Sequence, residues 1–522
     1  MINPKARPCD EAVIRATPVS APCVPRTQRY VLLATVLGSS MAFIDGSVVN
    51  VALPTIQRDL DTTLAAMQWV VNAYTLCLSS LVLIGGGLGD QLGRRMMFMI
   101  GIVVFAVASI GCGLASSAVV LVLARAIQGV GAALLVPSSL AILGAVFEEK
   151  DRGRVIGVWS GASAVAAGLG PVLGGWFVDH WSWRAIFLIN PALALPTLWI
   201  TLRWVPESRD PDARHKLDGF GALLSFCGLG GIVFGLIAAS QRGWHSLTVI
   251  GSIVAGVLLL AAFLRHEART AAPMVPLGLF RSHDFTGINL LTLLVYGALG
   301  GAFFFLPFAL VQIHGYTATA VGVTYLPFTL ILAALSRWFG GLLTRFGARR
   351  LLIVGPAISA LGFGLLALPG AQSSPAASFL LPMIVLGFGM AVTVAPLTTA
   401  LMDAVPARQV GVASGINNAV AAVASLLVIA VLGTIAVVEF DRSLDRHLQS
   451  TAASAEVRRA VDEVRGGLVP PPHETAIQPE VQPLVRRIIV ASWVDTTRLV
   501  MLAMAALAVA GAISVAFSLR SG

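Results

Sequence analysis

Asp45 and Arg125 are charged residues that lie deep inside long apolar stretches of the sequence. Charged side chains are rare in membrane-spanning segments and usually have a function there. If both stretches cross a membrane, each residue lies about 22 Å from the inner end of its stretch, at ~1.5 Å per residue. A carboxylate and a guanidinium at one depth can form an ion pair that offsets their loss of water.

Two interpretations of this pair are open. It can be a static ion pair that locks two helices together. Alternatively, a proton on Asp45 removes its charge, frees Arg125 and couples proton binding to a conformational change. We favour the switch, because a fold alone does not need a buried charge at this depth. We therefore expect the Asp45 carboxylate to reach an aqueous cavity.

A run of small residues, GLGPVLGG, occupies positions 168–175 inside another apolar stretch. Small residues let helix backbones approach closely, and a proline lets a membrane helix bend. Ordinary tight packing explains such a run, and so does a hinge that seals the outer half of a helix bundle. The candidate residues are Gly168, Gly170, Pro171, Gly174 and Gly175.

The segment GLGDQLGRR follows the second apolar stretch and combines a glycine-rich turn with one acid and two arginines. Basic residues collect in cytoplasmic loops, which explains the arginines but not the acid. The Asp90 carboxylate can cap a helix N-terminus or pair with a cation across two halves of the protein. The candidate gating residues are Gly87, Asp90, Gly93, Arg94 and Arg95.

Several polar side chains on the apolar stretches are candidates for lining a substrate cavity. Each alone is more often part of a helix–helix hydrogen bond than of a ligand site. The sequence has no Walker motif and no metal-ligand spacing, so we expect a proton gradient to supply the energy, without a cofactor. The cavity candidates are Asn50, Tyr74, Gln128, Asn289, Tyr296, Tyr325, Asn417 and Asn418.

The composition identifies the chain that carries these residues as a membrane protein. Of its 522 residues, 57% are hydrophobic and only 12% are charged, whereas soluble domains are about 25% charged. This excludes a water-soluble enzyme with one core. Basic cytoplasmic loops explain the net charge of +9 better than nucleic-acid binding does. Fourteen apolar stretches are long enough to span a bilayer as helices, namely 30–53, 68–86, 97–115, 119–140, 155–178, 185–204, 219–239, 247–264, 286–308, 320–341, 350–369, 378–401, 411–438 and 492–518.

We expect these spans to form two six-helix bundles with two additional helices between them. GLGDQLGRR after the second span resembles GLLTRFGAR after the tenth, so two helices separate the repeated halves. Lys and Arg concentrate in the short loops on the side of the termini, which places both termini in the cytoplasm. The expected parts are a cytoplasmic segment at 1–29, a first bundle at 30–204, two inserted helices at 205–265 and a second bundle at 266–518, with a polar, flexible external loop at 439–491.

Together the motifs resemble the 14-spanner drug:proton antiporters of the major facilitator superfamily, over residues 29–518. The resemblance rests on FIDGSVVNVALPTI, GLGDQLGRR, LVLARAIQGVGAAL, GLGPVLGG and WRAIFLINPA. It implies proton coupling by Asp45 and Arg125, a cytoplasmic gating loop around Asp90 and an antiporter motif at 168–175. Some relatives that export dications carry further acids in spans ten and thirteen, and this chain has none there.

The sequence therefore predicts a proton-coupled exporter of amphipathic drugs, antibiotics or metabolites in the cytoplasmic (inner) membrane. Its partners are the organic substrate, protons and the lipid bilayer, and we expect a monomer that binds no nucleic acid. The alternative is a proton-coupled symporter or facilitator for a small nutrient, which has no need of the antiporter motif. A membrane enzyme acting on lipid is less favoured, because the long loop holds no cluster of catalytic residues.

Overall fold

The computed structural model describes residues 25–209, 217–270, 273–370, 375–406, 409–451, 454–462, 464–465 and 481–519. Within these ranges the chain is helical apart from turns and short connections. Fourteen helical segments are long and apolar enough to cross a membrane. The chain is therefore an all-α membrane protein, and the predicted number of spans is confirmed.

The helices range in length from the 5 residues of η1 to the 41 residues of α14. Their bounds are α1 (Pro25–Asp59), α2 (Leu64–Leu92), α3 (Arg94–Gly113), α4 (Ala118–Val146), α5 (Glu149–His180), α6 (Ala185–Trp204), α7 (Gly219–Arg242), α8 (Leu247–Glu267), η1 (Leu277–Arg281), α9 (His283–His314), α10 (Ala318–Thr324), α11 (Leu326–Phe346), α12 (Ala348–Leu366), α13 (Pro375–Asp403), α14 (Val410–Ser450), α15 (Ala455–Asp462) and α16 (Gln482–Ser518).

The tenth span consists of two helices, α10 and α11, which are interrupted at Tyr325. Pro327 lies in the first turn of α11, where its missing N–H is tolerated because that group has no partner within the helix. The interruption leaves Tyr325 at the joint of the two pieces, where it lines the cavity described below.

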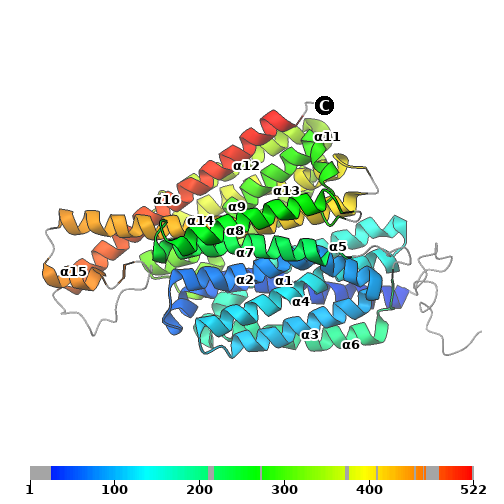
Figure 1. The fold of residues 1–522 in the computed structure, drawn as a ribbon, viewed down its shortest axis with the longest axis horizontal. Coiled ribbons are helices and arrows are strands. Elements are labelled where there is room, and N and C mark those ends of the chain that lie inside the picture. Colours follow the sequence, from blue (N-terminus) through cyan, green and yellow to red (C-terminus); the bar gives the residue numbers. More distant parts are fainter. Residues whose placement is uncertain are drawn as a thin grey trace, which may run out of the picture.

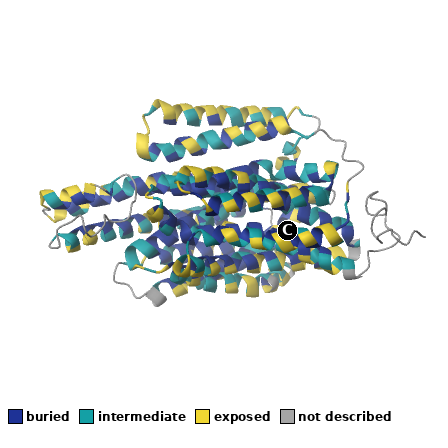
Figure 2. Ribbon diagram, turned by 90° about the horizontal axis from the view of Figure 1, so that it is seen from below, coloured by how far each residue is buried: buried dark blue, intermediate teal, exposed yellow. Residues whose placement is uncertain are grey.

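The two bundles lie side by side (Figure 1), with α1 to α6 packed together in one and α9 to α14 and α16 in the other. The inserted helix α7 packs on α2 of the first bundle and on α14 of the second, whereas α8 packs on α7. Figure 2 shows this hairpin at the edge of the molecule, with many exposed residues on its outer helix. The inserted pair thus bridges the bundles along one side, and its exposed apolar residues suit contact with lipid.

The segment between the last two spans differs from the polar, flexible loop expected at 439–491. Both α14 and α16 extend into it, and α15 lies between them. Phe440, Leu444 and Leu448 recur every four residues on α14 and are buried in one cluster with Ile489 of α16. Averaging hydropathy hides this helical period, because charged residues on the other face of α14 lower the mean.

Ion pairs hold the turn after α15 against α14. Arg465 donates to the carboxylates of Asp445 and Asp462. The hydrogen bond that Arg465 donates to Asp445 contributes most to raising the pKa of Arg465 above its ordinary value, although partial burial opposes the shift. The proline-rich part of the expected loop, residues 466–480, lies outside the described residues, as do residues 1–24 of the expected N-terminal segment.

The two ends of the membrane-spanning body differ. We call the end with residues 87–95 the loop end and the opposite end, where α5 meets α10, the seam end. At the loop end, Gly157 and Gly161 of α5 have open space around them, and Trp338 of α11 is 61% exposed. The contact between α5 and the second bundle is therefore concentrated at the seam end, whereas α2 and α14 also touch further toward the loop end, at Leu83 and Gly415.

Candidate functional site

The two charged residues singled out from the sequence form a direct ion pair. Nη1 of Arg125, on α4, donates to Oδ2 of Asp45, on α1. Asp45 is 0% exposed and Arg125 is 1% exposed. Two opposite charges offset each other's burial only with good geometry and additional hydrogen bonds. Their surroundings therefore decide whether this pair is stable.

Polar side chains on three helices complete the hydrogen bonding of the pair. Gln128 of α4 donates to Oδ1 of Asp45 at 2.7 Å and accepts from Arg125 at 2.7 Å. Asn190 of α6 donates to the same Asp45 oxygen at 3.2 Å. Ser109 of α3 accepts from both amides, at 2.8 Å and 3.2 Å. Sequence reasoning did not single out Ser109 or Asn190, although Asn190 lies within the motif WRAIFLINPA.

The remaining sides of the guanidinium are also enclosed. Nε of Arg125 donates to the Val70 carbonyl at 3.2 Å. The Tyr74 ring centre lies 4.3 Å from its Cζ and the Phe187 ring centre 5.9 Å, and aromatic faces attract cations. The sequence led us to expect that the Asp45 carboxylate reaches an aqueous cavity. In this conformation it does not, because the packed side chains of the first bundle enclose it.

A separate cavity of about 220 Å³ lies between the two bundles. In this conformation the cavity is smaller than the roughly 300–1,000 Å³ of drug-binding pockets, so it accommodates only a small ligand. One wall comes from α1 and α5 and includes Asn50, and the other comes from α9 to α11 and includes the rings of Phe303, Tyr325 and Phe328. The lining contains no acid and no base. Asp45 belongs to α1 as well but does not line this cavity.

The structure distributes the predicted cavity residues over several environments. Asn50 and Tyr325 line the cavity between the bundles. Tyr74 and Gln128 belong to the buried network around the ion pair. Asn418 is exposed, and Tyr296 is half-buried on α9 with its carbonyl accepting from Ser425.

The two other predicted cavity residues bond to each other inside the second bundle. Nδ2 of Asn417, on α14, donates to Oδ1 of Asn289 at 3.1 Å and to the Thr292 hydroxyl at 2.7 Å, both on α9. Asn289 in turn donates to the Phe285 carbonyl at 2.9 Å. All of these side chains are buried. This network of the second bundle therefore carries no charge.

The glycines of the 168–175 segment allow close approach on two sides of α5. An added Cβ at Gly170 would overlap Ser47, and one at Gly174 would overlap Val48, both on α1. On the other side, Gly168 faces Thr329 of α11 and Gly175 faces the backbone of α10 at Ala318. The carbonyl of Pro171 faces Gly322 of α10. The segment therefore packs α5 against its own bundle and against the other bundle at once.

Asp179, one helical turn beyond this segment, extends the contact between the bundles. Its two carboxylate oxygens accept from the backbone N–H groups of Ala318 at 3.0 Å and Thr319 at 2.7 Å. Those groups open α10 and have no partner within their own helix. A side chain of the first bundle therefore caps a helix of the second, and nothing local in the sequence predicted that partner.

In the 87–95 segment, Asp90 accepts from Arg94 at 2.8 Å, one turn away, rather than from a cation of the other bundle. Gly93 adopts a φ of 129° between α2 and α3, a conformation that favours glycine. The carboxylate of Glu207 lies against Gly93 and accepts from the N–H groups of Arg95 at 3.0 Å and Met96 at 3.1 Å. Glu207, which sequence reasoning missed, thus caps α3.

The two remaining residues of this segment also contact nearby parts of the chain. The side chain of Arg95 donates to the Leu202 carbonyl at 3.4 Å, at the end of α6. Gly87 lies against Leu217, which precedes α7. The segment is therefore folded onto the first bundle and the start of the inserted helices.

Two helix bundles with a cavity between them define a membrane transporter of the two-bundle type. The sequence matches the family model of the Major Facilitator Superfamily over residues 35–226 and 217–429. The chain belongs to this superfamily and, within it, to the drug:proton antiporter family. Its relatives are transporters of small organic compounds and not enzymes.

Two relatives show how far the similarity extends. The chain is 36% identical over 459 residues to the multidrug resistance protein Stp of Mycobacterium tuberculosis, covering 86% of this chain and 85% of that protein. It is 34% identical over 405 residues to the tetracenomycin C resistance and export protein of Streptomyces glaucescens, covering 77% and 75%.

Solved structures show the same fold at low sequence identity. A bacterial homolog of the human lysosomal transporter Spinster aligns with a TM-score of 0.64 at 16% identity, covering 95% of this chain and 97% of that one. A POT family transporter in complex with 5-aminolevulinic acid aligns with a TM-score of 0.63 at 13% identity, covering 97% and 98%.

Proposed function

We propose that the chain exports small amphipathic organic compounds across the cytoplasmic membrane in exchange for protons. The observation that carries the proposal is the fully buried Asp45–Arg125 pair of the first bundle, together with a cavity of about 220 Å³ between the bundles. Relatives named for multidrug resistance and for antibiotic resistance and export support the direction of transport. The loop end is then cytoplasmic, with both termini on that side, and the proton gradient rather than a cofactor supplies the energy.

The lining of the central cavity indicates the class of substrate. Aromatic rings of Phe303, Tyr325 and Phe328 provide apolar surface, and Asn50 and Thr329 provide a few hydrogen-bonding groups. A site without acids gives no compensation for two positive charges. Neutral or singly charged amphipathic molecules fit this lining, and dications do not.

Protonation of Asp45 would change the balance of the buried network. The neutral carboxyl no longer compensates Arg125, so the amides of Gln128 and Asn190 lose the charged acceptor that orders them. Because the carboxylate is enclosed in this conformation, proton exchange requires a second conformation in which the network opens. The seam between α5 and α10 is the contact whose opening would provide it.

Transport by purified protein in proteoliposomes tests this proposal. We expect Asp45→Asn to fold and insert but to lose substrate movement driven by an imposed pH gradient, because the variant has no carboxyl to protonate. Asp61→Asn is the matched control, since Asp61 is exposed between α1 and α2. Wild-type transport by Asp45→Asn would refute the coupling. Accumulation of substrate along the proton gradient, instead of against it, would indicate the symporter.

A further inference from the structure

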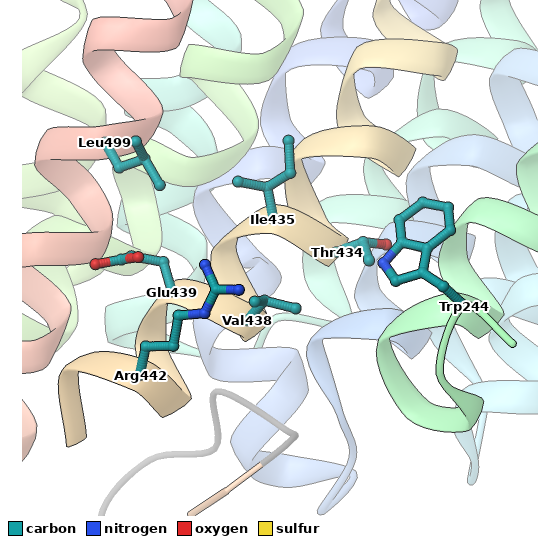
Figure 3. A pocket seen from close by; sticks show the side chains of 7 residues that line it. All are labelled: Trp244, Thr434, Ile435, Val438, Glu439, Arg442 and Leu499. Atoms are coloured by element: carbon teal, nitrogen blue, oxygen red, sulfur yellow. The ribbon is translucent and has the colours of Figure 1, made fainter. Parts of the chain in front are cut away.

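A second pocket lies away from the central cavity, where the turn between α7 and α8 approaches α14 and α16 (Figure 3). It is open to the outside and has a volume of about 170 Å³. Trp244 forms one side and Arg442 rises from α14 into the space, with Ile435 and Leu499 on the apolar side. None of these residues belongs to the ion-pair network or to the cavity between the bundles.

The pocket lies at the level of the membrane surface at the seam end. Thr434 of α14 donates to the carbonyl of Leu236 of α7, which aligns the two helices at this point. Counting ~1.5 Å per residue, Arg442 lies about 12 Å beyond Thr434 and the end of α7 at Arg242 about 9 Å beyond Leu236. Arg442 is therefore level with the α7–α8 turn. Trp244 in that turn is 49% exposed, as is typical of a tryptophan at a membrane–water interface.

The hydrogen-bonding groups of the pocket select an anion. Within the part of the chain that the structure describes, neither the Arg442 guanidinium nor the Trp244 indole N–H has a hydrogen-bond or ion-pair partner. The one acid of the lining, Glu439, is already paired with Arg446 at 2.5 Å. Arg446 is shared with Asp495 at 3.6 Å, and the exposed Arg442 is the charged lining residue without a partner among the described residues. A guanidinium matches the oxygens of a phosphate with two parallel hydrogen bonds.

We propose that this pocket binds the phosphodiester headgroup of a phospholipid in the leaflet at the seam end. Arg442 holds the phosphate oxygens, and the indole N–H of Trp244 donates to the same group. The acyl chains run along Ile435 and Leu499, toward the apolar part of the bilayer. Such a lipid contacts the inserted hairpin and the second bundle together, so it ties α7 and α8 to α14 and α16.

Native mass spectrometry of the full-length protein, titrated with phosphatidylethanolamine, phosphatidylglycerol and diacylglycerol of equal chain length, tests the proposal. Both phospholipids share the phosphodiester, so both should bind, whereas diacylglycerol should not. We expect Arg442→Gln to weaken both phospholipids about tenfold, the effect of one lost charge-assisted hydrogen-bonded contact. Arg242→Gln is the matched control, because Arg242 is an exposed arginine at the same level that does not line the pocket.

Trp244→Phe keeps an aromatic side chain but removes the N–H together with the five-membered ring of the indole, so it should weaken phospholipid binding about threefold. Arg442→Lys should give an intermediate loss, and it replaces the glutamine variant if that protein does not elute as a single species. Unchanged binding in Arg442→Gln or Arg442→Lys overturns the proposal, as does an equal loss in Arg242→Gln. Displacement of the lipid by equimolar inorganic phosphate or glycerophosphoethanolamine also overturns it, because the site then serves a soluble phosphate compound.

Discussion

The two bundles bury polar networks of different kinds. The first encloses a carboxylate and a guanidinium, which are held by side chains from neighbouring helices. The second encloses Asn417, Asn289 and Thr292, which carry no charge and join only α9 to α14. Only the first network changes its charge when a proton binds. We therefore propose that the response to pH arises in the first bundle, whereas the asparagine network of the second serves packing.

The largest effect should follow from breaking the charged network. Arg125→Ala leaves the Asp45 carboxylate buried without its cation, which costs about 3–5 kcal/mol when one partner of a buried pair is removed. We expect a lower unfolding temperature and no transport, and a smaller loss in Arg125→Lys, which keeps the charge. The double variant Arg125→Ala/Asp45→Asn should recover part of the stability. Equal stability of the single and double variants would contradict a charge-compensated pair.

The second largest effect is expected at the contact between the two bundles, where Asp179 caps α10. Asp179→Ala removes the cap from the start of α10, which typically costs about 0.5–2 kcal/mol. Because this cap acts between bundles, we expect the seam to open more often. Distances between spin labels at the ends of α5 and α10 should then shift to longer values. Asp179→Asn keeps one acceptor and should lie between the alanine variant and wild type; identical distances in all three would show that the cap does not hold the seam.

The smallest effect is expected in the neutral network. Asn417→Ala removes the hydrogen bonds to Asn289 and Thr292, and such interhelical bonds in membranes contribute about 0.6 to 1.7 kcal/mol. Transport should slow modestly while its dependence on the pH gradient stays that of wild type. A changed pH dependence in this variant would show that the second bundle also takes part in coupling.

The spans and the charged pair were predictable from the sequence because both depend on local signals. Long apolar stretches define membrane helices, and counting residues along two of them is enough to put Asp45 and Arg125 at one depth. The partners Ser109 and Asn190 were not predictable in this way. Serine and asparagine are common in helix contacts, and only the packing of α3 and α6 brings them to the carboxylate.

The capping residues show a second limit of sequence reasoning. Asp179 and Glu207 each accept from N–H groups of a helix that is distant in the sequence. A cap is recognisable in a sequence when it lies just before its helix, and neither of these does. The extensions of α14 and α16 were missed for a related reason. Their apolar faces are buried by packing against each other and against α15, which are segments distant in the sequence.

Proton release on substrate binding is the most direct test of the central claim. Substrate is added to the purified protein in weakly buffered detergent solution at successively lower pH, because only the neutral form of Asp45 can release a proton, and a pH indicator reports the protons that leave it. The account predicts release by the wild type and by Asp61→Asn, and none by Asp45→Asn. Release from Asp45→Asn equal to that of the wild type would contradict it.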